Sequence, residues 1–228
     1  MIKNSKAELI KRFERKWLFN GSNIELVKLA IIRSKFLFNE VYSPRAVNSI
    51  YFDDCKFSSI IQNLDGVKRK VKYRVRWYGK SDIIQNPQLE IKSKDGYITQ
   101  KKTINLNLER DIKFNFDGVN LLKKLILKNI MYQKNLVPIA STHYFRHYYL
   151  SANKKIRATL DSNLRSSLLY GYTNYYFKRY INNQVLEFKY DNTFDNFVRK
   201  NLKNITSRIS KNSKYVISAI EKPISFLS

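Results

Sequence analysis

Segments in which apolar and charged residues alternate with a period of two recur along this chain, and they constrain its fold more than any other feature. In residues 71–78, for example, Tyr73 and Val75 alternate with Arg74 and Arg76. Such alternation is typical of a β-strand with one apolar and one polar face. It predicts strands at residues 13–17, 47–53, 71–78, 89–94, 96–104, 142–150, 155–161 and 186–190. About eight strands are enough to close a β-barrel.

Helical signals lie between these strands. Ser22 and Glu25 have the spacing of a capping box and predict a helix over residues 24–38. Asp65 and Gly66 indicate the end of a helix over residues 56–64, since glycine suits the left-handed position after a helix. Further helices are expected at residues 118–133, 194–205 and 215–219. We interpret residues 1–228 as a single α+β domain, an eight-stranded antiparallel β-barrel with helices packed outside.

The chain carries a large excess of positive charge. Its 228 residues include 43 Lys and Arg against 18 Asp and Glu, a net charge of +25. This excess indicates a polyanionic partner: nucleic acid, an anionic membrane or a phosphate-rich small molecule. Cys55 is the only cysteine, which excludes a disulfide framework and a zinc cluster of several cysteines. We expect a cytoplasmic protein with no membrane segment, because no stretch approaches the roughly 18 uncharged apolar residues of a spanning helix.

Charged or polar residues on the predicted strands are paired so that both members of a pair share a face. The pairs are Glu14 with Lys16, Arg74 with Arg76, Glu90 with Lys92, Glu187 with Lys189, Tyr144 with Arg146, and, at a wider spacing, Arg157 with Asp161. These faces either lie in solvent on a β-sandwich or line the lumen of a barrel. The repeated wording Phe-Glu-Arg-Lys, Leu-Glu-Ile-Lys and Leu-Glu-Phe-Lys favours a charged lumen.

A lumen of this composition suits a highly charged anion. Arginine offers paired donors to phosphate oxygens, and lysine offers a compact positive charge. Glutamate cannot bind phosphate directly, but it can hold a divalent metal ion that bridges phosphate oxygens. Nucleic acid is disfavoured as the partner, because binding it requires no inward glutamate and usually uses exposed aromatic residues.

Eight short motifs, in this order, resemble the VTC domain of the vacuolar transporter chaperone proteins, a branch of the triphosphate tunnel metalloenzyme superfamily. They are Arg-Phe-Glu-Arg-Lys-Trp at 12–17, Asn-Ser-Ile-Tyr-Phe-Asp-Asp at 48–54, Asp-Gly at 65–66 followed by Lys-Tyr-Arg-Val-Arg-Trp-Tyr-Gly at 72–79, Leu-Glu-Ile-Lys-Ser-Lys at 89–94, Tyr-Phe-Arg at 144–146, Arg-Ala-Thr-Leu-Asp at 157–161, Leu-Glu-Phe-Lys at 186–189 and Ser-Lys-Tyr at 213–215. The resemblance implies an eight-stranded tunnel that binds ATP or another triphosphate together with inorganic polyphosphate. It also implies a phosphotransferase that moves the γ-phosphoryl group of ATP onto polyphosphate, with Mn²⁺ or Mg²⁺ as cofactor.

The resemblance assigns roles to individual residues. The residues expected to line the tunnel and grip phosphates are Lys16, Arg74, Arg76, Lys92, Arg146, Arg157 and Lys189. Further contacts to the substrate are expected from Tyr144, Lys101, Ser213 and Lys214. Glu187 is the expected metal ligand, with Glu14 and Glu90 as candidate supports.

Two other functions remain open at this point. Members of the superfamily also hydrolyse triphosphates, so a tunnel triphosphatase acting on tripolyphosphate or a nucleoside triphosphate is an alternative. A polyphosphate-binding subunit without activity is another. Lysines on the predicted helices, such as Lys123 and Lys124, indicate a solvated face or a docking patch for long polyphosphate.

Overall fold

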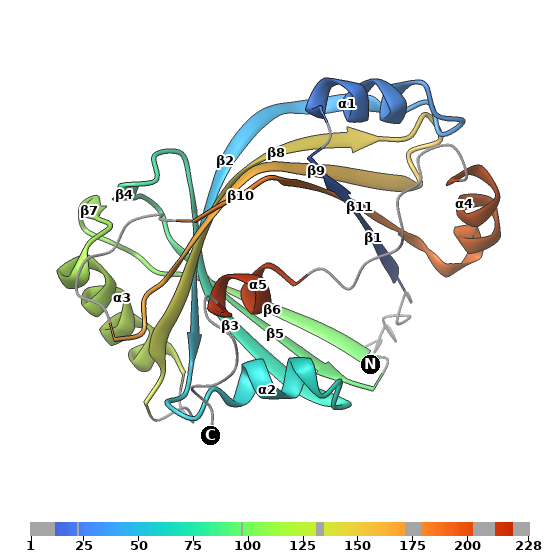
Figure 1. Ribbon diagram of the computed structural model, residues 1–228. Helices are drawn as coiled ribbons and strands as arrows, with labels where there is room; N and C mark the ends of the chain where they lie inside the picture. Colours follow the sequence, from blue (N-terminus) through green and yellow to red (C-terminus); the bar gives the residue numbers. More distant parts are fainter. Residues whose placement is uncertain are drawn as a thin grey trace, which may run out of the picture. The chain divides into compact units, whose positions relative to one another are not determined.

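The computed structural model describes residues 12–21, 23–96, 98–130, 135–171, 179–202 and 213–220 (Figure 1). Its main feature is a nine-stranded sheet in which the path β1-β11-β9-β8-β2-β3-β5-β6 contains the predicted eight strands, and β10 pairs with β9. The strands are β1 (Arg12–Asn20), β2 (Asn39–Asp53), β3 (Arg69–Tyr78), β5 (Gln88–Asp95), β6 (Ile98–Asn105), β8 (Val137–Leu150), β9 (Ile156–Leu168), β10 (Arg179–Ile181) and β11 (Asn183–Asp191). A separate antiparallel pair, β4 (Ile83–Ile84) and β7 (Ile112–Lys113), was not predicted.

The helices confirm the α+β class. They are α1 (Ile24–Ile32), α2 (Ser58–Leu64), α3 (Phe116–Asn129), the 3₁₀ turn η1 (Asn192–Phe194), α4 (Asp195–Asn201) and α5 (Lys214–Ala219). In the described part of the chain, every helix is too short or too polar to span a bilayer.

Several helix boundaries differ from the prediction, the first helix most of all. The first helix is capped by Asn23, whose side chain accepts a hydrogen bond from the Glu25 backbone N–H at 2.9 Å; Ser22 lies outside the described residues. This helix ends at Ile32 instead of residue 38, and Leu37 then takes a left-handed φ of 50°. The helices predicted to end at 133 and 205 end earlier, at Asn129 and Asn201; positions 133 and 205 themselves lie outside the described residues.

The chain folds into two compact units. The first comprises residues 1–44, 147–161 and 183–212, and the second comprises residues 45–146, 162–182 and 213–228. Neither unit is a continuous segment, because β2, β8 and β9 each contribute residues to both. The expectation of a single domain over residues 1–228 stays a prediction.

In the first unit, the apolar face of the strands is covered by helices. Trp17 and Phe188 from β1 and β11 lie in one buried cluster with Val27 of α1 and Val198 of α4. The rings of Trp17 and Phe188 meet edge to face, with centroids 5.1 Å apart. The charged side chains of the same strands therefore lie on the opposite face.

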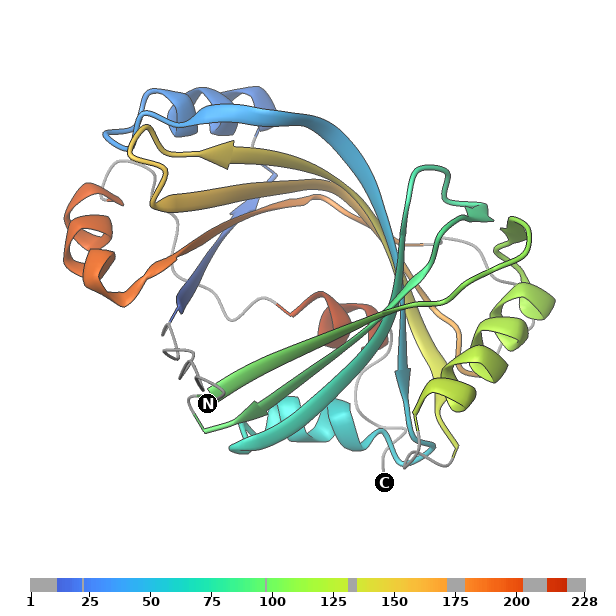
Figure 2. The ribbon, with the colours of Figure 1, turned by 180° about the vertical axis from the view of Figure 1, so that it is seen from behind.

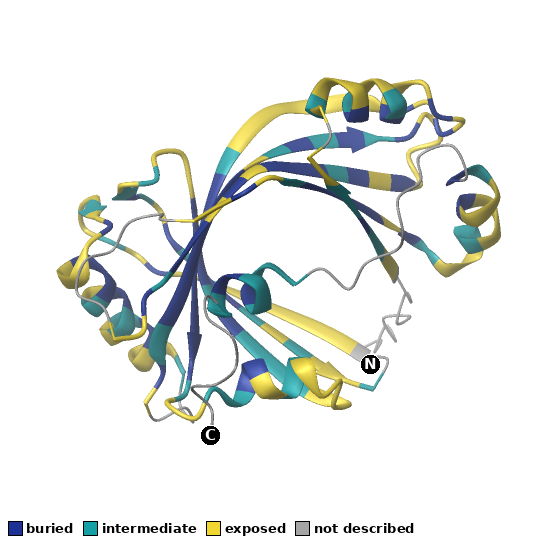
Figure 3. Cartoon of the chain, viewed as in Figure 1, coloured by how far each residue is buried: buried dark blue, intermediate teal, exposed yellow. Residues whose placement is uncertain are grey.

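In the second unit, α3 covers the apolar face. Val119 and Leu122 of α3 lie in a buried cluster with Val75, Trp77 and Leu89. Figure 3 shows how burial follows these central strands, while the outer side of α3 is exposed. This arrangement leaves the alternate residues of β3 and β5 on the other face, as the alternation predicts.

Helix α5 is an exception to the outside placement of helices. Tyr215 stacks on Tyr51 with ring centroids 4.9 Å apart, and Tyr51 lies opposite Arg74 in the β2–β3 register. The Tyr215 hydroxyl donates a hydrogen bond to Asp53 at 2.7 Å. Both ribbon views show α3 and α5 on opposite sides of β2 and β8 (Figures 1 and 2). In the second unit, α5 therefore packs on the charged face of the sheet.

Candidate functional site

The register of β3, β5 and β6 brings the predicted cations of the second unit onto one face. Lys72 lies opposite Lys92, and Lys92 lies opposite Lys101. Like charges on directly opposite residues destabilise a sheet. We call these residues the lysine row; its charge suits an anionic ligand. Lys72 was missed by the sequence analysis, although it continues the alternation of Arg74 and Arg76.

Glu90 is the counter-ion of this face. It is buried, and its carboxylate accepts a hydrogen bond from Arg74 Nε at 2.6 Å and from Lys101 Nζ at 2.9 Å, with Arg76 Nη1 at 3.4 Å. Burial alone would raise the pKa of Glu90, but Arg74, Arg76 and Lys101 outweigh it and lower the pKa to about 2. Both carboxylate oxygens are thus occupied by cations, which makes Glu90 a structural counter-ion in this state.

Cations also gather around Tyr144. The Arg76 guanidinium donates to the Tyr144 hydroxyl at 3.4 Å, the Arg146 guanidinium lies 5.3 Å from the Tyr144 ring centroid, and Lys214 Nζ lies 4.7 Å from the same centroid. Helix α5 supplies Lys214, and the residue before it, Ser213, accepts a hydrogen bond from Lys72 through its hydroxyl at 3.2 Å. The fold therefore brings together four predicted residues from β3, β8 and α5: Arg76, Tyr144, Arg146 and Lys214. Ser213 directly precedes the last of them.

A smaller charged array lies on the first unit. Lys16 lies opposite Glu187, Glu14 lies opposite Lys189, and Arg157 lies opposite Lys189 on the other side. Lys16 Nζ is 2.6 Å from a Glu14 oxygen and 3.6 Å from a Glu187 oxygen, and Lys189 Nζ is 2.7 Å from Glu187. All five predicted residues of this unit thus share one face.

The protonation states of this array are set by mutual attraction. Burial opposes the charge of Lys16, but Glu187, Glu14 and Asp161 raise its pKa. Burial also opposes the charge of Glu187, but Lys16 and Lys189 lower its pKa. Asp161 was paired with Arg157 in the sequence but was not included among the site residues. The effect of Asp161 on the pKa of Lys16 depends on the register between β9 and β11, which places Asp161 opposite Val185.

Glu14 and Glu187 are the carboxylates that fit a divalent metal ion. Both bind the ammonium group of Lys16, so they already converge on one cation. The described residues contain no group of three or more His, Cys, Asp or Glu that could hold a metal by itself. Mg²⁺ is usually held by one or two carboxylates with phosphate oxygens completing its shell. This pair therefore suits a metal ion that arrives with a phosphate ligand.

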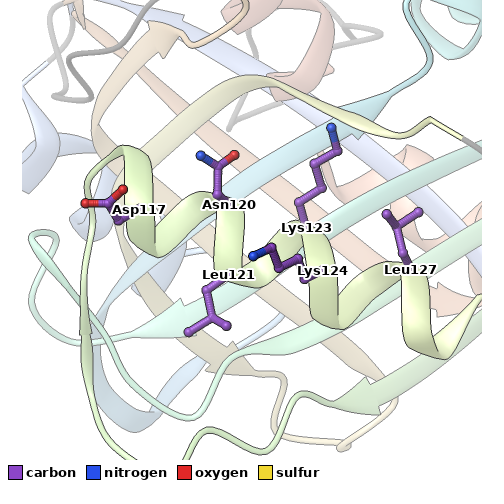
Figure 4. Close-up of a pocket in the computed structure, with 6 residues that line it drawn as sticks. All are labelled: Asp117, Asn120, Leu121, Lys123, Lys124 and Leu127. Carbon is purple, nitrogen blue, oxygen red and sulfur yellow. The ribbon is translucent and has the colours of Figure 1, made fainter.

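A surface depression of about 510 Å³ lies elsewhere, along α3 (Figure 4). It is lined only by residues of that helix: Asp117, Asn120, Leu121, Lys123, Lys124 and Leu127. None of the predicted site residues contributes to it. That the lysines of this helix form a docking patch for polyphosphate therefore stays a prediction.

Comparisons with known proteins bear on the family and the fold of this chain. The model of the VTC domain family matches residues 11–220. No curated protein matches the chain. The chain is similar in structure to a putative adenylate cyclase from Vibrio parahaemolyticus, with a TM-score of 0.51 and 13% identity over 91% of this chain and 98% of that one; this likeness supports the fold.

Two further structures are less similar. The PH1819 protein from Pyrococcus horikoshii OT3 has a TM-score of 0.47 and 10% identity over 90% of this chain and 97% of that one. The inorganic triphosphatase NE1496 has a TM-score of 0.34 and 9% identity over 91% of this chain and 94% of that one. At these scores neither structure adds to the argument.

Proposed function

Because this chain belongs to the VTC domain family, we propose that it is a polyphosphate polymerase that transfers the γ-phosphoryl group of ATP onto inorganic polyphosphate, with Mn²⁺ or Mg²⁺ as cofactor. Family membership supports the coarser part of this proposal, an enzyme that acts on triphosphates by transfer or hydrolysis. The observation that carries it furthest is the lysine row. Three opposed lysines on one face, with Glu90 as their neighbouring counter-ion, are suited to a chain of phosphates.

The second unit is proposed to grip the phosphates. Arg74 and Arg76 offer forked donors to phosphate oxygens, and Lys92 adds a point charge. Phosphoryl transfer requires little covalent chemistry from a protein, so orientation and charge stabilisation are sufficient for catalysis. An acceptor that is an ionised phosphate needs no general base. Arg146 and Lys214, which lie against the Tyr144 ring, add charge to the same face.

The first unit is proposed to hold the divalent metal ion, on Glu187 and Glu14. When bound, this ion supplies positive charge to phosphate oxygens. Lys16 pairs with both carboxylates, and Lys189 also pairs with Glu187, so metal binding competes with these lysines for the same carboxylate groups. Arg157 and Lys189, opposite each other on the same face, are proposed to contact phosphate oxygens.

One experiment separates the three candidate functions. Purified protein is incubated with ATP and Mn²⁺, and the products are resolved on a gel that separates polyphosphate chain lengths. A ladder of long chains together with ADP supports the polymerase. Free phosphate alone would replace it with a tunnel triphosphatase, and tight polyphosphate binding without turnover would replace it with a binding subunit.

A further inference from the structure

Three buried hydroxyl groups on neighbouring strands of the second unit make no hydrogen bond. They belong to Ser49 on β2, Thr142 on β8 and Ser166 on β9, each with 0% of its surface exposed, and no described residue is bonded to their oxygen atoms. We call these residues the hydroxyl row. β9, β8 and β2 are consecutive in the sheet and lead to β3, where Arg76 lies opposite Ser49. Within the described part of the chain, the Nε atom of Arg76 is also buried without a partner.

The hydroxyl row lies on one face of the sheet. Ser49 stands between Val47 and Tyr51, which belong to two apolar clusters, and alternate residues of a strand share a face. Thr142 and Ser166 stand in the same relation to the two clusters on their own strands, flanked by Ala140, Tyr144, Leu164 and Leu168. Because neighbouring strands are about 4.8 Å apart, the three hydroxyl groups form a short line that ends at Arg76.

Helix α5 covers this line. Tyr215 belongs to the cluster that contains Tyr51, and Ile217 packs against the cluster that contains Val47. The helix thus packs against the clusters on both sides of the hydroxyl row. It gives the row no hydrogen bond in return, and its own Ser218 hydroxyl donates to the backbone carbonyl of Tyr215.

Buried polar groups nearly always have partners, so a line of unpaired donors needs an explanation. A hydroxyl group rotates to suit an acceptor and adds no charge. On the same face as the lysine row, neutral donors can therefore bind further phosphate oxygens without increasing the repulsion between cations. The three hydroxyl groups thus have the arrangement of a ligand-binding surface that α5 covers without forming hydrogen bonds to it.

We propose that the hydroxyl row and Arg76 Nε bind phosphate oxygens of tripolyphosphate or a longer polyphosphate, and that α5 shifts away from the row when this ligand binds. The inference rests on the proposed function, since it takes its ligand from that function. The long side chain of Lys214 lets its ammonium group stay near the phosphate as the helix moves. The hold on α5 is local: it includes the Tyr215–Asp53 hydrogen bond and the stacking of Tyr215 on Tyr51.

The test removes the hydroxyl groups and measures both stability and binding. Thr142→Val keeps the side-chain shape, and a triple variant adds Ser49→Ala and Ser166→Ala. Because the hydroxyl groups are unpaired without ligand, we expect an unchanged or higher melting temperature in both variants. Calorimetric titration with tripolyphosphate should show affinity reduced about threefold in Thr142→Val and at least about tenfold in the triple variant. Ser141→Ala is the matched control, since Ser141 is also buried and unpaired among described residues but lies on the opposite face of β8.

The outcomes separate this inference from the proposed function. If the wild-type protein does not bind tripolyphosphate, the proposed function fails. If it binds and the triple variant binds equally well, only the hydroxyl row is overturned. A lower melting temperature in Thr142→Val would show that its hydroxyl group has a partner in the free protein, and would also overturn the inference.

The movement of α5 has its own readout. Tyr215→Phe removes the hydrogen bond to Asp53, so less free energy opposes the shift of the helix. A loss of about 1 kcal/mol corresponds to tripolyphosphate binding that is about fivefold tighter. Weaker binding in this variant would mean that the ligand requires α5 in its present position, and would overturn the proposed displacement.

Discussion

Replacing Glu90 with Gln tests whether the cations of the second unit depend on a single carboxylate. Glu90→Gln keeps the side-chain shape but removes the negative charge that Arg74, Arg76 and Lys101 share. The ordinary pKa of 4.5 falls to about 2 in the folded protein, and each pH unit of that difference corresponds to about 1.4 kcal/mol. The full difference is about 3 kcal/mol. Because 51% of the Lys101 side chain is exposed and its attraction is screened, we expect a loss of about 2 kcal/mol.

The assay is urea denaturation at pH 7, with the unfolding free energy compared between wild type and Glu90→Gln. Glu25→Gln is the matched control, because Glu25 pairs with Lys28 at 2.8 Å on an exposed helix face and should lose less than about 0.5 kcal/mol. The folded-state pKa of Glu90 is depressed, so its contribution is complete above about pH 4.5 and is lost as the pH falls towards about 2. The difference between wild type and variant should therefore shrink in acid.

Two results would refute this reasoning. A loss no larger than that of Glu25→Gln would mean that water already solvates the cations around Glu90. A difference that stays constant from pH 7 down to pH 3 would mean that the variant acts through packing and not through charge. Added tripolyphosphate should raise the melting temperature of Glu90→Gln more than that of wild type, since the ligand replaces the missing negative charge.

Four other substitutions follow from the same geometry. Glu187→Gln should abolish metal-dependent turnover of ATP while Glu25→Gln retains it, and activity that persists with Mn²⁺ would remove Glu187 from the metal site. Lys92→Gln relieves repulsion in the lysine row, so it should stabilise the free protein by about 0.2–1 kcal/mol in thermal melts. The same variant should bind tripolyphosphate more weakly in calorimetry. A variant that loses both stability and affinity would contradict this expectation. Tyr215→Phe should cost about 1–3 kcal/mol of unfolding free energy, because its hydroxyl group donates to the buried Asp53 carboxylate. Tyr190→Phe, which loses a similar bond to Asp195 at 2.9 Å, should show a comparable loss of stability with unchanged tripolyphosphate affinity.

The strands were predictable because the alternation of apolar and polar residues lies within each strand's own sequence. Tyr73 and Val75 alternate with Arg74 and Arg76, and this pattern survives whatever the strand pairs with. The N-terminal extension of β2 was missed because its residues 39–45 are all exposed, so it has no apolar face to signal. The two-residue strands β4 and β7 are too short for any period to show.

The partners within the site could not be read from the sequence. Glu90 and Lys92 are neighbours in one motif, but Glu90 is held by Arg74 and Arg76 because the β3–β5 register places it opposite Arg74. The position of α5 was equally hidden. A six-residue helix has no long stripe from which to predict its contacts, and the placement of Tyr215 depends on Asp53, which lies 162 positions away.

The pairing of β1 has a consequence for the order in which this protein folds. In the described sheet β1 lies at the end of the strand path and pairs with β11, so residues 12–20 meet residues 183–191. Contacts between such distant segments form slowly, because a long loop must close first. On a ribosome, the earliest strand to emerge must wait for one of the last. A nascent chain halted before residue 183 should therefore leave Trp17 open to fluorescence quenching in a Trp77→Phe background, and protection at that stage would show that β1 finds another partner first. Until residues 183–201 have been synthesised, β1 lacks both its partner strand β11 and the helix α4, whose Val198 lies in the same buried cluster as Trp17.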